Sequence, residues 1–104
     1  MPVTLKVTKT RALSKIIGLI GANHPQALLI KTRFGIHTFG LRFPIDLAVL
    51  DHNGVVQTTR KGFKPNGIFL WSPRYNRILE LPVGTLEKKQ IKKGVQMTLV
   101  FDQK

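Results

Sequence analysis

The stretch from Thr32 to Val56 reads TRFGIHTFGLRFPIDLAVLDHNGVV and decides the fold. Its apolar run Ile45–Leu50 contains one polar residue, Asp46, so both alternating sets of side chains are otherwise apolar. That pattern is typical of a central strand with both faces covered. The next four residues, 51–54, read DHNG, and Asn and Gly tolerate the positive φ that a tight hairpin needs. The stretch therefore predicts a buried strand, a turn and a returning strand over Val55–Arg60.

Upstream of this strand, three phenylalanines are interleaved with Gly35 and Gly40, which let backbones pass close to one another. We expect residues 37–41 to form a strand. Pro44 cannot donate a backbone hydrogen bond to a ladder, so it predicts a bend around Phe43-Pro44.

The flanking sequence predicts more short elements. Alternation of apolar and polar residues predicts strands at 2–9 and 95–101, and short apolar segments between turn signals predict strands at 27–30, 68–71 and 76–81. A helical period predicts a short helix at 11–20, and a Thr85 cap predicts a second short helix through Ile91. The expected architecture is a single mainly-β domain over residues 1–104. It is a compact sandwich, jelly-roll-like or partly closed barrel of seven or eight short strands with one short N-terminal helix.

Charge is the most unusual feature of the composition. Lys and Arg total 17 against 5 Asp and Glu, a net charge of +12, and residues 1–44 contain no acidic residue. Such a field attracts nucleic acid or another polyanion, although it also serves solubility alone. The basic residues are spread along the chain, and the aromatic signature of sequence-specific RNA binders is absent.

The chain lacks the residues that several kinds of site require. The chain has no Cys, which excludes disulfides, thiolate metal sites and Cys nucleophiles. No metal-binding spacing, serine-hydrolase elbow or phosphate loop is present, so we expect no metal and no cofactor. No segment reaches the ~20 apolar residues of a membrane span, and the start of the chain does not resemble a secretory signal, which predicts a cytoplasmic protein.

Asp46 is the residue with the strongest claim to a role, because a carboxylate in an apolar strand must be hydrogen-bonded or paired. Its partner would be a basic or hydroxyl side chain: Arg42 if Pro44 folds it back, or otherwise Arg33, His37 or Thr38. Asp46 then fixes the fold, or it binds a ligand or acts in catalysis. Glu80 leaves the same alternatives open.

Aromatic and basic residues meet again at Trp71-Ser72-Pro73-Arg74-Tyr75. Such a loop stacks on a sugar or a base, although a Trp there also serves as a core anchor. The candidate ligand-binding residues are therefore His37, Arg42, Asp46, Trp71, Arg74, Tyr75 and Glu80.

Beyond these patterns, the chain resembles domain-of-unknown-function family 192. The resemblance rests on residues 39–46 (FGLRFPID), 47–51 (LAVLD), 54–56 (GVV), 18–20 (GLI), 64–65 (KP) and 79–84 (LELPVG), and it covers about residues 10–100 in the family's order. It implies a small mainly-β fold with one early helix and no established function. Gly40 departs from the bulky aromatic usual there, and Gly21-Ala22 replaces an Arg, which would widen or recharge a pocket; many relatives also carry an export leader.

Three hypotheses about function follow. The first is a non-enzymatic binding or accessory module that holds an unknown ligand or protein on a surface around residues 37–46 and 71–77. The second is a nucleic-acid-associated protein held by diffuse basic charge. The third is a small enzyme that uses Asp46.

Overall fold

The computed structural model describes residues 2–11 and 27–101 of the 104-residue chain. Its strands are β1 (Val3–Arg11), β2 (Leu28–Lys31), β3 (Gly35–His37), β4 (Ile45–Leu50), β5 (Val56–Phe63), β6 (Ile68–Leu70), β7 (Arg77–Pro82) and β8 (Met97–Phe101), and helix α2 spans Thr85–Lys88. Of the helix predicted at 11–20, only Arg11 is among the described residues, and it is the last residue of β1. The rest of that prediction lies outside the described residues. No helix in the described ranges has the length and apolar character needed to cross a membrane.

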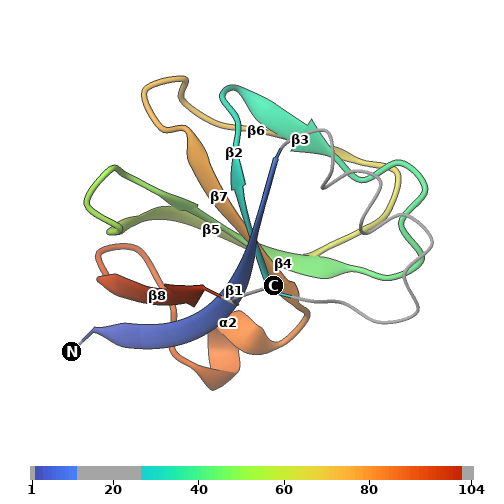
Figure 1. The fold of residues 1–104 in the computed structure, drawn as a ribbon. Coiled ribbons are helices and arrows are strands. Elements are labelled where there is room, and N and C mark those ends of the chain that lie inside the picture. Colours follow the sequence, from blue (N-terminus) through green and yellow to red (C-terminus); the bar gives the residue numbers. More distant parts are fainter. Residues whose placement is uncertain (1, 12–26, 102–104) are drawn as a thin grey trace.

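Six strands form one curved sheet in the order β5-β4-β7-β2-β1-β8 (Figure 1). The strands from β5 to β2 are antiparallel, whereas β1 runs parallel to both of its neighbours. The first half of β1 pairs with β8 and the second half with β2. At the far end the curl brings residues 94–97 back to residues 54–56, where three backbone hydrogen bonds of 2.8–2.9 Å join the ends. The predicted compact, mainly-β fold is confirmed, with partial and not full closure among the described strands.

The central position of β4 explains its apolar composition. Every residue of β4 is buried between β5 and β7. Ile45, Leu47 and Val49 belong to one apolar cluster, and Ala48 and Leu50 belong to the other. The two-stranded ribbon β3–β6 packs on the first cluster and α2 on the second, so the two lie on opposite faces of the sheet (Figure 1).

The ribbon is shorter than the sequence predicts. The expected strand at 37–41 is wrong, because β3 ends at His37 and the chain turns through residues 38–41. Thr38 causes the turn: its buried hydroxyl donates to the Lys64 carbonyl and accepts the Gly67 N–H, both at 2.9 Å. These bonds tie the turn to the loop before β6, and Gly40 supplies a positive φ of 86°.

The helix after β7 also differs from expectation. It was predicted to continue to Ile91 under a Thr85 cap, but α2 ends at Lys88 and its N-cap is Gly84, at a φ of 94°. Thr85 instead donates its hydroxyl to the Pro82 carbonyl at 2.6 Å. Gln90, with a φ of 56°, ends the helical path.

The predicted hairpin between β4 and β5 is confirmed, and Asp51 holds it. One oxygen of this carboxylate accepts the N–H groups of Asn53 and Val55, and the other accepts the Gln57 amide, all at 2.9 Å. Burial alone would raise the pKa of Asp51, but these hydrogen bonds and the neighbouring His52 outweigh burial and lower it below its ordinary value of 3.8.

This lowered pKa predicts that Asp51 stabilises the fold in a pH-dependent way. Its contribution is fully present above the unfolded-state pKa near 3.8 and is lost as the pH falls through the lower folded-state value. Urea unfolding of the unmodified protein and of Asp51→Asn should therefore show a difference in unfolding free energy that is largest above pH ~4 and shrinks below it. A difference that stays constant through this range would contradict the assignment.

Candidate functional site

The structure distributes the predicted site residues over separate places. Asp46 lies on β4, where that strand meets the end of β5 and the start of α2, and Glu80 is buried on β7. His37 lines the outer surface of the ribbon, and Trp71 and Tyr75 line a pocket beside it. Arg42 and Arg74 are exposed and line neither.

Asp46 is 1% exposed, and both of its carboxylate oxygens are engaged by backbone N–H groups. Oδ1 accepts the N–H of Gly62 at 2.9 Å, and Oδ2 accepts those of Gly84 and Leu86 at 3.0 Å each. The expected basic or hydroxyl partners are therefore wrong: three backbone amides surround the carboxylate. Amide donors satisfy a buried anion as well as a basic side chain does.

Each of the three amides belongs to an irregular piece of backbone that needs an acceptor. The pairing of β4 with β5 shifts register between Ile45 and Leu47, and Gly62 lies in this irregularity with a φ of 58°. Gly84 and Leu86 begin α2, where the first N–H groups of any helix lack partners within it. One carboxylate thus satisfies a bulge and a helix start together, which favours an architectural role for Asp46.

Replacing the carboxylate with an amide of the same shape should weaken this junction. Asp46→Asn loses the charge and points an NH₂ group at a backbone donor, so we expect the unfolding free energy to fall by about 3 kcal/mol. The matched control is Glu87→Gln, at an exposed residue of α2, which should change the unfolding free energy by less than about 0.5 kcal/mol. Equal effects of the two variants in urea unfolding would overturn the architectural role.

Glu80 is fully buried on β7, where it stands in register with Leu28 of β2 and Leu47 of β4. Its side chain has an interaction partner within the protein. Because it is fully buried between two neighbouring strands, it does not line the ribbon surface or the pocket beside it.

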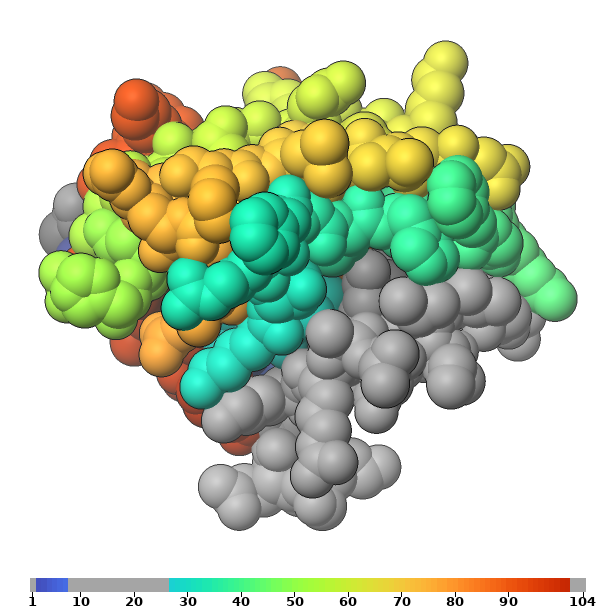
Figure 2. All heavy atoms as spheres, turned by 90° about the horizontal axis from the view of Figure 1, so that it is seen from above, coloured from blue at the N-terminus to red at the C-terminus, as the bar shows by residue number. Residues whose placement is uncertain are grey.

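The outer face of the ribbon is apolar, whereas the exposed face of a two-stranded ribbon is usually polar. Ile36 and Phe69 point inward to the sheet, but Ile68 and Leu70 are 61% and 69% exposed. Phe34 and Phe39, at the two ends of β3, are 62% and 48% exposed. Figure 2 shows this face, with β3 in teal beside β6 in yellow. We call the set formed by Phe34, His37, Phe39, Ile68 and Leu70 the ribbon surface; it surrounds an open hollow of about 340 Å³.

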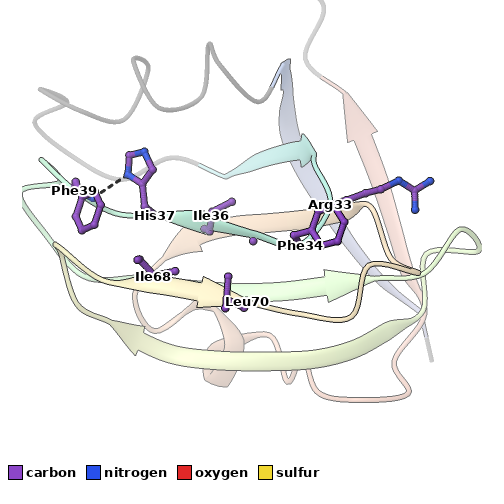
Figure 3. A pocket seen from close by; sticks show the side chains of 8 residues that line it. Arg33, Phe34, Ile36, His37, Phe39, Ile68 and Leu70 are labelled. Carbon is purple, nitrogen blue, oxygen red and sulfur yellow. Dashed lines mark hydrogen bonds between the residues drawn. The ribbon is translucent and has the colours of Figure 1, made fainter.

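Backbone geometry holds this surface in place. Phe34 has a φ of 75°, a value that bulky residues rarely adopt, so its exposed position is imposed by its surroundings. His37 stacks on Phe39 at 4.8 Å between ring centroids and accepts the Phe39 N–H through Nδ1 at 3.2 Å (Figure 3). A Cβ on Gly35 would lie 2.5 Å from the Leu70 side chain, so the hollow depends on glycine at that position.

The charges beside the ribbon surface are basic. Arg33 lies next to Phe34 and donates to the Pro73 carbonyl at 2.7 Å (Figure 3). At the opposite end the backbone carbonyl of Lys64 accepts the Thr38 hydroxyl, so only the main chain of this exposed residue is held near the ribbon. In the described part of the chain no carboxylate lines the hollow. The ribbon surface therefore combines apolar side chains with a basic border at Arg33.

Sequence reasoning found His37 but missed most of this surface. The strand predicted at 68–71 is confirmed as β6, but a run that is apolar at every position does not reveal that one of its faces is exposed. The positive φ of Phe34 leaves no signal in the sequence. The one available sign was the spacing of Phe34, His37 and Phe39 around Gly35, which marked an aromatic cluster.

Comparison with known proteins identifies the fold. No family model matches the chain, and no curated protein matches it. A protein of unknown function from Novosphingobium aromaticivorans is similar in structure, with a TM-score of 0.70 over 85% of this chain and 69% of that one, at 13% identity. A protein from Sinorhizobium meliloti, for which a role as a transcription regulator has been suggested, has a TM-score of 0.69 over 85% of this chain and 76% of its own, at 17% identity. At these identities the shared property is the fold.

Proposed function

We propose that the protein is a non-enzymatic binding module whose ribbon surface holds a segment of an acidic partner protein. The observation that carries this proposal is the gathering of Phe34, Phe39, Ile68 and Leu70, each about half exposed or more, around one hollow. Contiguous exposed apolar side chains cost solubility and mark interaction sites in soluble proteins.

The basic charge of the protein favours an acidic partner. Arg33 lines the hollow, the chain has a net charge of +12, and no described residue lining the hollow is acidic. A segment that alternates apolar side chains with carboxylates would fill the hollow and meet the basic border. Electrostatic complementarity of this kind sets partner choice and association rate more than affinity.

The test uses a synthetic peptide of about nine residues that alternates Asp and Leu. We expect it to shift the backbone amide NMR signals of the ribbon surface and of Arg33. A peptide with Ser in place of Leu lacks the apolar contacts and should shift them several-fold less at equal concentration.

The double variant Ile68→Ser/Leu70→Ser should weaken binding of the Asp-Leu peptide by about tenfold or more. The control is Val83→Ser, since Val83 is 53% exposed but lies beside α2, away from the ribbon. The proposal fails if the Ser peptide binds as well as the Leu peptide, or if Val83→Ser weakens binding as much as the double variant.

Nucleic-acid association is the second candidate, favoured by the exposed aromatic rings of Phe34 and Phe39 and by Arg33 next to Phe34. Bases stack on such rings, and basic side chains follow the phosphates. If a single-stranded oligothymidylate shifts the same amides, and its affinity falls steeply between ~50 and ~200 mM salt while the peptide shifts nothing, this candidate replaces the first.

We also infer membership of domain-of-unknown-function family 192. What supports it is that the residues carrying the resemblance occupy positions where hydrogen bonding, backbone φ or burial restricts the residue type. Asp46 binds three backbone amides, Gly54 and Gly84 have positive φ values, and Glu80 is fully buried. Residues with such constraints resist substitution. An alignment of homologues in which Asp46 and Gly84 vary freely would contradict the inference.

A further inference from the structure

A second hollow, of about 340 Å³, lies beside the ribbon surface. Its lining is more polar than that of the first hollow. It opens between the start of β5 and the segment that joins β6 to β7. Its lining residues are Gln57, Thr58, Phe69, Leu70, Trp71, Ser72, Tyr75 and Lys93. This volume falls within the range of roughly 300–1,000 Å³ that small-molecule sites occupy.

The aromatic wall of this pocket is fixed before any ligand arrives. The Trp71 indole N–H donates to the Tyr75 carbonyl at 2.8 Å, and its ring packs on Phe69 at 5.7 Å between centroids. The Tyr75 hydroxyl reaches Gln57 Oε1 at 3.4 Å, which links the loop to β5. A wall held this way loses little conformational entropy on binding.

The polar groups of the pocket favour an anion. Thr58 and Ser72 provide hydroxyls, and the exposed Lys93 provides a positive charge. No acidic residue is among the described residues that line it. Asp51, the carboxylate bonded to Gln57, accepts two backbone N–H groups and the Gln57 amide and does not line the pocket.

We propose that this pocket binds a small organic anion that carries a planar ring. The ring lies against Trp71 and Tyr75, and the anionic group meets Lys93 and the two hydroxyls. Stacking and charge each contribute modestly, so a ligand that has both features binds more tightly than a ligand with one. The anionic group can be a phosphate or a carboxylate, and the experiment separates the two.

The chain supplies its own reporter, because Trp71 is its single tryptophan. Intrinsic fluorescence is followed during titration with adenosine monophosphate and with benzoate, at constant ionic strength. Adenosine and benzamide serve as neutral counterparts, and inorganic phosphate serves as an anion without a ring. We expect a saturable change with one or both ringed anions, and at least a fivefold weaker response with their neutral counterparts.

Lys93→Gln and Lys92→Gln form a matched pair, since both residues are exposed neighbours and Lys93 alone lines the pocket. Lys93→Gln should raise the dissociation constant of the binding anion about fivefold, and Lys92→Gln should leave it unchanged. A response to adenosine monophosphate alone identifies a phosphate ligand, and a response to benzoate alone identifies a carboxylate; either supports the proposal.

Three results would overturn it: no saturable change with either ringed anion up to about 10 mM, neutral compounds that bind as tightly as their anions, or equal effects of the two lysine variants. The pocket and the ribbon surface are tested separately, because Ile68 lines the ribbon surface and not the pocket. Ile68→Ser should therefore leave the fluorescence titration unchanged while it weakens peptide binding.

Discussion

The rest of the structure depends on one buried carboxylate. Asp46 lies near the start of β4, the second strand from one edge of the sheet, and it bonds no side chain among the described residues. It accepts hydrogen bonds from three backbone amides that are 16, 38 and 40 residues away in sequence. Burying a charge is costly unless it is fully hydrogen-bonded, and here the same bonds satisfy amides that would otherwise lack acceptors. The constraint joins β4, the irregular end of β5 and the start of α2 into one unit.

The other face of β4 supports the ribbon. Because both faces of β4 are covered, Ile45, Leu47 and Val49 form a floor on which the ribbon β3–β6 packs through Ile36 and Phe69. With these two side chains directed inward, the alternation of the strands directs Ile68 and Leu70 outward. The candidate binding surface therefore follows from which face of the ribbon packs on the sheet. The pocket at Trp71 lies at the end of β6.

Local patterns were sufficient to predict much of the fold. The apolar run 45–50, the turn at 51–54 and the alternation at 2–9 each specify their conformation through neighbours in sequence, and all three are confirmed. The burial of Asp46 and its need for a partner were also predictable. The identity of its partners was not, because backbone amides are the same in every residue and only the chain path brings them together.

The same physics explains the errors at the site. The strand expected at 37–41 fails because the Thr38 hydroxyl bonds the loop at 64–67, a contact between segments 26 and 29 residues apart. Exposure of Ile68 and Leu70 could not be read from the sequence, since residues 68–71 are apolar throughout and do not show which face of the strand is covered. Trp71 and Tyr75 were found because their signal, aromatic residues around a turn, is local.

The most direct measurement of the central claim is native-state hydrogen exchange at the amides of Gly62, Gly84 and Leu86. If the Asp46 carboxylate holds all three, they should exchange with similar, high free energies of opening, close to those of the β4 amides and well above those of amides in the exposed turn at 52–53. The account is contradicted if Gly62 exchanges independently of Gly84 and Leu86, or if all three exchange as fast as the turn.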